Sequence, residues 1–315
     1  MRVVFIGASK FGLRCLDLLN QQPECQIAGV VTAPQKFSIS YRTEGVTNVL
    51  YADIDAYCRE NCLECFIIHE GMKSPALIST IQAWKPEIFI VSGWYHMIPK
   101  AWRDLAPAYG LHASLLPDYS GGAPLVWAMI NGESKTGITL FKMLGGVDNG
   151  PVVGQAETAI YDDDTIGTLY ARIEDLGLKL LKTYLPALAN GTAPHLMQDE
   201  SYRRLFPQRG PQDGEIGWSQ DARSIVNFIR AQTKPYPGAF TTWQGKRLIV
   251  WKSRLVVDAE ERTCPVPGQV LPLRNTTLVQ AAQNFVEIIE ASYEEKIIKG
   301  HQLRSIIGGG GILGR

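Results

Sequence analysis

Short apolar runs alternate with amphipathic segments through the first half of the chain. The runs of strand length are residues 2–6, 26–31, 65–68, 87–91 and 111–114. Apolar residues recur at helical spacing in residues 11–19, 54–61, 74–84 and 123–130. Strands that alternate with helices in this way predict βαβ units on a parallel sheet. We therefore expect an α/β domain with a Rossmann-like parallel sheet.

The second half of the chain has a different pattern of apolar and polar residues. Residues 136–143 and 152–158 alternate between apolar and polar, which predicts two paired strands, and residues 165–188 predict a long amphipathic helix. A helix is also predicted at residues 219–233, and it is followed by strand-like segments at residues 239–242, 247–257, 268–271, 277–281 and 285–291. Several short strands in succession are typical of a small β-barrel of the OB type.

Composition places the domain boundary. Residues 203–217 are rich in Gly, Pro and Arg, which is typical of a linker. We therefore expect an N-terminal catalytic domain at residues 1–202, a linker at 203–217 and an OB-like domain at 218–315. The glycine run Gly308–Gly311 is expected to be a loose chain end.

Charge and hydropathy exclude several classes of protein. Lys+Arg and Asp+Glu both number 31, so the chain lacks the basic excess of a nucleic-acid binder. The N-terminal apolar run is too short for a signal peptide, and no run approaches the roughly 18 residues of a membrane helix. We expect a cytoplasmic protein with no nucleic-acid partner and no membrane association.

Two motifs resemble cofactor sites, but each lacks a feature that such a site requires. Cys58, Cys62, Cys65 and His69 have a spacing compatible with zinc, but the predicted passage from helix to strand separates their side chains, so we expect no metal. The turn at residues 7–12 follows a strand and opens a helix, yet it lacks the G-x-G-x-x-G pattern of a dinucleotide site. We interpret it as either structural or substrate-lining.

One histidine and one carboxylate carry the candidate chemistry. His112 follows a buried-looking strand at the carboxyl edge of the sheet, where open α/β sheets bind ligands. Asp148 lies in a loop with three glycines, residues 144–151. An imidazole can transfer a proton or donate to an oxyanion, and a nearby carboxylate can orient it. The pair suits proton transfer during acyl transfer to an amine, with His112 and Asp148 as catalytic residues.

The segment 109–117 contains H-x-S-L-L-P and is followed by G-x-D-x-G at residues 146–150. This order resembles the 10-formyltetrahydrofolate-dependent formyltransferases from Arg2 to about Leu188. The family has an Asn-His-Asp set, and this chain carries Gly110 where the asparagine belongs. Either another donor, such as Ser92, Asn149 or a water, replaces that oxyanion contact, or the chain is a slow or non-catalytic relative.

The resemblance also implies binding residues. Residues 92–98 resemble the segment that binds folate mostly through main-chain hydrogen bonds. The folate-binding residues implied are Ser92, Gly93, Trp94, Tyr95, Met97, Ile98, Gly145, Gly146 and Val147. The substrate-binding residues implied are Ser114, Gly121, Gly122, Ala123 and Arg209. The co-substrate is then 10-formyltetrahydrofolate.

Two branches of the family compete. Methionyl-tRNA formyltransferases carry a basic loop after the second strand, whereas residues 33–42 here have only Lys36 and Arg42 as positive residues. Residues 208–214 and 235–240 resemble the nucleotide-sugar branch instead. We therefore expect formyl transfer to the amine of a nucleotide-linked amino sugar. Methionyl-tRNA formyl transfer, a folate hydrolase, a non-catalytic binding protein and a homodimeric state stay open.

Overall fold

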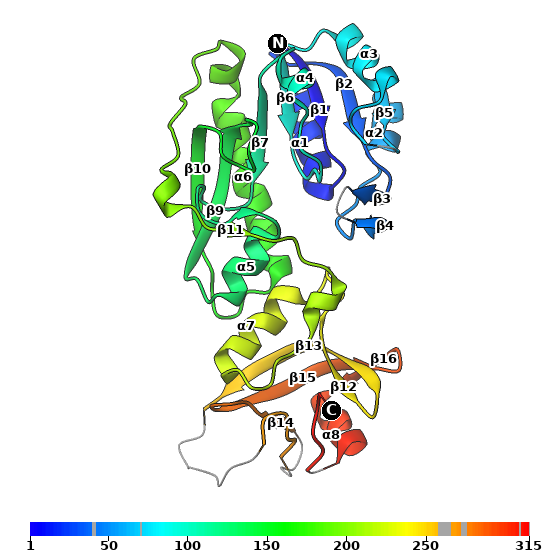
Figure 1. The fold of residues 1–315 in the computed structure, drawn as a ribbon, viewed down its shortest axis with the longest axis vertical. Helices are drawn as coiled ribbons and strands as arrows, with labels where there is room; N and C mark the ends of the chain where they lie inside the picture. The colour runs from blue at the N-terminus through cyan, green and yellow to red at the C-terminus, as the bar shows by residue number, and fades with distance from the viewer. Residues whose placement is uncertain (40–41, 70, 258–265, 272–275, 309, 315) are drawn as a thin grey trace. The chain divides into compact units, whose positions relative to one another are not determined.

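The computed structural model describes residues 1–315 except 40–41, 70, 258–265, 272–275, 309 and 315 (Figure 1). Ser40 and Tyr41 of the weakly charged segment 33–42 therefore lie outside the described residues. The chain forms two compact units. The first comprises residues 1–121, 136–158 and 171–206, and the second comprises residues 122–135, 159–170 and 207–315. The proposed boundaries at residues 202 and 218 stay a prediction.

The first unit is built on a seven-stranded sheet with the order β10-β9-β7-β6-β1-β2-β5. In chain order these strands are β1 (Arg2–Ile6), β2 (Gln26–Thr32), β5 (Cys65–Ile67), β6 (Ile88–Val91), β7 (Ala108–His112), β9 (Lys135–Lys142) and β10 (Val152–Ala159). Strands β7, β6, β1, β2 and β5 are neighbours in that order and pair in parallel. Strand β9 pairs with β7 in antiparallel fashion. The predicted Rossmann-like sheet is confirmed.

Local signals place the helices of this half of the chain. They are α1 (Lys10–Asn20), α2 (Ile54–Glu60), α3 (Pro75–Trp84), α4 (Lys100–Arg103), α5 (Pro124–Ile130) and α6 (Ile166–Ala189). Ser9 caps α1 by accepting a hydrogen bond from Gly12 N at 3.0 Å, and Ser74 caps α3, whose first residue is Pro75. A hairpin of β3 (Lys36–Ile39) and β4 (Arg42–Thr47) was not expected from the sequence.

The second unit combines helices with an antiparallel sheet. Its strands are β12 (Ala239–Trp243), β13 (Lys246–Val256), β14 (Thr277–Gln280), β15 (Phe285–Tyr293) and β16 (Lys296–Lys299), and its C-terminal helices are α7 (Ala222–Gln232) and α8 (Gly300–Ile307). Helix α5 packs on α7, and α7 packs on β13. The sheet curls into a half-barrel, which confirms the predicted OB-like fold class.

Within the glycine run near the C-terminus, of which Gly309 lies outside the described residues, Gly310 and Gly311 are not part of a loose end. Gly310 N donates to Val270 O at 2.9 Å, and Val270 N donates to Gly311 O at 2.8 Å. Leu313 is buried in the core of the second unit. The expectation was wrong because backbone pairing with residues 269–270 holds this segment in place. Those residues form isolated bridges and not the continuous strand predicted at 268–271. Among the helices of the described part, none is both long and apolar enough to span a bilayer.

Candidate active site

The structure brings His112 and Asp148 together. His112 is the last residue of β7, and Asp148 lies in the loop between β9 and β10. His112 Nδ1 lies 3.6 Å from Asp148 Oδ2, and the two side chains are 12% and 17% exposed. The two groups, 36 positions apart in the chain, therefore form one largely shielded pair that a ligand can still reach.

Hydrogen bonds assign the proton on the imidazole. His112 Nε2 lies 2.8 Å from the carbonyl oxygen of Tyr119. A carbonyl only accepts, so Nε2 carries the hydrogen and donates it. In the neutral ring the basic atom is then Nδ1, which faces Asp148. The Asp148 carboxylate is itself held, because Gly121 N donates to its Oδ2 at 2.8 Å.

Gln198 holds the loop that carries Asp148. Its Nε2 donates to Asp148 O at 2.8 Å and to Gly150 O at 2.6 Å. Gly150 is sterically required, because a Cβ there would lie 1.6 Å from Lys142 O. Asp148 has a φ of 48°, a left-handed conformation that aspartate tolerates better than most residues. The sequence carried no signal for Gln198.

Met143 fills the space beside Gly110. Gly110 lies on β7 two residues before His112, so the two positions share a face of the strand. A Cβ built on Gly110 would lie 3.2 Å from Met143 Sδ and 3.3 Å from Phe141 Cε1. The nearest atoms to this Cβ position belong to Met143 and Phe141 and are not hydrogen-bond donors, and no sequence pattern pointed to Met143 there.

The two ends of the predicted folate segment are buried. Ser92 and Ile98 are almost inaccessible, and Cys15 Sγ donates to Ser92 Oγ at 3.6 Å. Burial raises the pKa of the Cys15 thiol to about 12. Gly93 has a φ of 61°, and a Cβ there would overlap Ser9 Oγ at 1.8 Å, so glycine is required. Ser92 therefore faces the core.

The middle of the segment is more accessible. Trp94 Nε1 donates to Met72 Sδ at 3.3 Å, and Tyr95 Oη donates to Asn48 Oδ1 at 2.9 Å. Both rings are partly buried, whereas Met97 is 51% exposed. These contacts fix the orientation of the two aromatic rings and leave part of their surface open.

Backbone hydrogen bonds and close packing hold the turn at residues 7–12. Ala8 N donates to Gly93 O at 3.3 Å, and Lys10 N donates to Leu50 O at 2.8 Å. A Cβ at Gly7 or Gly12 would lie within 2.8 Å of Ser92 O. A dinucleotide site needs free amides in this turn for the pyrophosphate. Here the amides of Ala8 and Lys10 are committed to the protein, which disfavours a dinucleotide, and the substrate-lining alternative for this turn stays a prediction.

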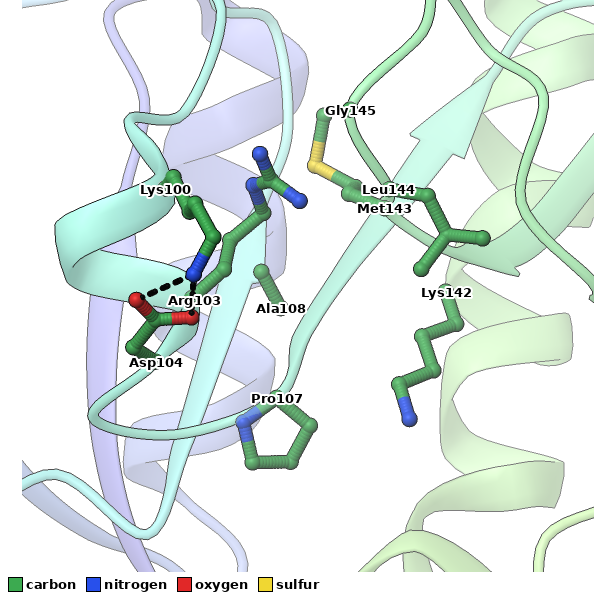
Figure 2. Close-up of a pocket in the computed structure, with 9 residues that line it drawn as sticks. All are labelled: Lys100, Arg103, Asp104, Pro107, Ala108, Lys142, Met143, Leu144 and Gly145. Carbon is green, nitrogen blue, oxygen red and sulfur yellow. Dashed lines mark hydrogen bonds and ion pairs between the residues drawn. The ribbon is translucent and has the colours of Figure 1, made fainter.

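A pocket of about 410 Å³ opens beside the glycine-rich loop (Figure 2). Its lining is Lys100, Arg103, Asp104, Pro107, Ala108, Lys142, Met143, Leu144 and Gly145. Arg103 Nε donates to Ile98 O at 3.1 Å, so the pocket adjoins both segments predicted to bind folate. It lies at the amino end of β7, whereas His112 is at the carboxyl end.

The loop residues predicted to bind folate differ in their surroundings. Gly145 and Val147 are exposed, and Gly146 N donates to Asn149 Oδ1 at 3.2 Å. Val147 O accepts a hydrogen bond from Arg203. Within the described residues, Asn149 Nδ2 has no hydrogen-bond partner, so this amide is available as a donor close to Asp148.

The residues predicted to bind the substrate fall in both units. In the first unit Ser114 is fully buried and its Oγ donates to Asp118 O at 2.7 Å, while Gly121 contacts Asp148. In the second unit, Gly122 packs against Gln208, and Ala123, with a φ of 48°, precedes α5.

Arg209, the fifth predicted substrate-binding residue, also lies in the second unit. Its guanidinium lies 4.6 Å from the ring of Trp127 and 5.6 Å from that of Phe228. Burial lowers its pKa from the ordinary arginine value. Its role in binding stays a prediction, as do the roles of the other residues named above.

The chain belongs to the formyl transferase family. The family model "Formyl transferase" matches residues 1–185, and the model "Formyl transferase, C-terminal domain" matches residues 209–304. The predicted family is thus confirmed.

Solved structures of two formyltransferases and of the protein HypX share the fold. An N-formyltransferase from Helicobacter canadensis, solved with folinic acid and dTDP-3-aminofucose, is 18% identical with a TM-score of 0.63, covering 91% of this chain and 98% of that one. A methionyl-tRNA formyltransferase from Clostridium thermocellum is 19% identical with a TM-score of 0.54, covering 81% and 94%. HypX from Aquifex aeolicus, solved with tetrahydrofolic acid, is 17% identical with a TM-score of 0.60, covering 96% of this chain but only 47% of HypX. This chain therefore spans about half the length of HypX.

Proposed function

We propose that the protein transfers the formyl group of 10-formyltetrahydrofolate to the amine of a nucleotide-linked amino sugar. The observation that carries this proposal is the His112–Asp148 pair, in which a basic Nδ1 faces a held carboxylate. Membership of the formyl transferase family supports the reaction type. The ligands of the Helicobacter canadensis enzyme support the choice of both substrates.

The residues fit a flat polar co-substrate. Trp94 and Tyr95 offer partly exposed ring surfaces, and the exposed Gly145 leaves backbone groups open to a ligand. The co-substrate supplies an activated formyl carbon whose bond to nitrogen breaks as the bond to the amine forms. The amine loses one proton, and the folate nitrogen gains one, so the protein must accept a proton and return it.

His112 and Asp148 are suited to that proton transfer. The neutral imidazole can take a proton at Nδ1, because Nε2–H is engaged with Tyr119 O. The adjacent Asp148 carboxylate stabilises the imidazolium that results. Asp148 can alternatively accept the proton from the amine directly. Either route leaves an imidazolium or a carboxylic acid that protonates the leaving nitrogen.

Three alternatives to this function differ in the substrate that is used or in whether any reaction occurs. Charged tRNA is disfavoured because the chain has no net charge and phosphate contacts dominate nucleic-acid affinity. A folate hydrolase would use water in place of the amine. A non-catalytic binding protein is compatible with the absence of a side-chain donor at Gly110.

The test measures tetrahydrofolate release with dTDP- and UDP-linked amino sugars, with methionyl-tRNA and with no amine. We expect saturable release only with an amino sugar, and a product whose amine carries one formyl group by mass spectrometry. Efficient formylation of methionyl-tRNA would overturn the substrate proposed here. Release without any amine would indicate the hydrolase, and binding without release would indicate a non-catalytic relative.

A further inference from the structure

A two-stranded sheet lies directly beside the His112–Asp148 pair. Strand β8 (Ser120–Gly121) pairs in parallel with β11 (Leu205–Phe206), a segment about 85 positions later in the chain. The backbone at β8 contacts both members of the pair. Tyr119 O accepts from His112 Nε2, and Gly121 N donates to Asp148 Oδ2. Whatever holds β8 therefore also sets the geometry of the pair.

Side chains of residues 203–206 strengthen this attachment. Arg204 donates two hydrogen bonds to the Asp118 carboxylate, at 2.7 and 2.6 Å, and its guanidinium lies 4.6 Å from the centre of the Tyr119 ring. The ring of Phe206 stacks on Tyr119 with the centroids 4.6 Å apart and the planes 7° from parallel. Tyr119, whose carbonyl contacts His112, is thus held by two side chains of the segment.

The same segment also contacts the other loop. Arg203 donates to Val147 O, one residue before Asp148, and Ser120 N donates to Arg204 O at 3.0 Å. Residues 203–206 therefore contact the loop that follows His112 and the loop that carries Asp148. We call these four residues the strap.

We infer that the strap positions the proton-transfer pair, with Arg204 and Phe206 acting through Tyr119. The inference rests on the proposed function of His112 and Asp148. A carbonyl fixed at Nε2 keeps the hydrogen on that atom and leaves Nδ1 as the base. If Tyr119 O moves away, the hydrogen can shift to Nδ1 and donate to Asp148. The neutral ring then no longer presents a base on that side.

The experiment compares Phe206→Leu with the conservative Phe206→Tyr and with a matched control, Tyr202→Leu. Tyr202 precedes the strap and is 71% exposed. Phe206→Leu removes the stacking ring but leaves the backbone pairing of β11 possible. We measure kcat and KM for both substrates, thermal stability, and the ring-nitrogen chemical shifts of His112 by NMR, which report the tautomer.

Phe206→Leu should lower kcat by roughly ten- to a hundredfold with KM nearly unchanged, because a wrong histidine tautomer impairs the chemical step more than binding. The His112 nitrogen shifts should move toward a mixture of tautomers. Phe206→Tyr should restore both readouts, and Tyr202→Leu should resemble the wild type. Arg204→Gln should act like Phe206→Leu, with partial recovery in Arg204→Lys.

Two results would overturn the inference. One is a kcat and a tautomer that are both unaffected by Phe206→Leu. The other is a loss of activity that follows thermal stability alone while the His112 shifts stay as in the wild type. If the wild type transfers no formyl group, the proposed function fails, but the His112 shifts still decide whether the strap controls the tautomer.

Discussion

Gly110→Asn tests how this chain performs without the asparagine of its relatives. The new Cβ would lie 3.2 Å from Met143 Sδ and 3.3 Å from Phe141 Cε1, which is tighter than ordinary contact. The amide group extends further into space that Met143 fills. Overpacking of this kind costs about 1–3 kcal/mol. Because methionine is flexible, we expect a value toward the lower end of that range and a correspondingly lower Tm.

The effect of Gly110→Asn on turnover separates the two explanations for the missing asparagine, which are a replacement donor and a slow or non-catalytic relative. One oxyanion donor is typically worth about 10²–10³ in turnover. If another donor has replaced the asparagine, the wild type turns over at an ordinary rate and Gly110→Asn gives no gain. We expect a fall in turnover, because the displaced Met143 also lines the pocket beside Gly145.

The assay is steady-state tetrahydrofolate release combined with thermal and chemical unfolding. Gly110→Ala adds only the Cβ and isolates its cost, which should be smaller. Adding Met143→Ala to Gly110→Asn makes room, so the double variant should lose less stability than the sum of the two single losses. A nearly inert wild type that gains about a hundredfold or more from Gly110→Asn would refute the reasoning. The site would then be a degraded one, and the functional proposal would reduce to shared ancestry.

Four further perturbations test the site. His112→Asn should lower turnover by roughly a hundredfold or more with little effect on folding, and turnover within a few-fold of the wild type would contradict its role. Asp148→Asn should lower kcat strongly and change KM less, whereas an effect confined to affinity would make Asp148 a binding residue. Asn149→Ala should lower turnover by about 10²-fold if its Nδ2 is the replacement donor, with a small fall in Tm from the lost bond to Gly146 N, and unchanged turnover excludes it. Burial lowers the pKa of His96, so the unfolded chain takes up a proton more readily than the folded protein. The contribution of His96 to the free energy of unfolding is therefore fully present above about pH 6.5, the pKa of histidine in an unfolded chain. It is lost as the pH falls toward the lowered pKa of His96 in the folded protein. The free energy of unfolding of His96→Gln should show a weaker pH dependence in that window, and an unchanged dependence would contradict the account.

The sequence by itself determined the class of fold and singled out the candidate pair, His112 and Asp148. Strand β1 has the bounds that the apolar run predicted, and the Ser74-Pro75 start of α3 was visible in the sequence. These features are local, because periodicity and caps depend on residues a few positions apart. His112 and Asp148 were singled out from their motifs, and the fold then brought the end of β7 and the loop after the antiparallel strand β9 together.

Only the tertiary structure decided how that pair is held. The contact of Gln198 with the Asp148 loop, the strap at residues 203–206 and the side chain of Met143 beside Gly110 all join distant parts of the chain. Gly310 and Gly311 near the C-terminus are likewise held by pairing with Val270. Such contacts leave no periodic pattern in the sequence, because a backbone hydrogen bond or a filled space can be supplied by many residue types. They exist only once the strands have set the distances between segments.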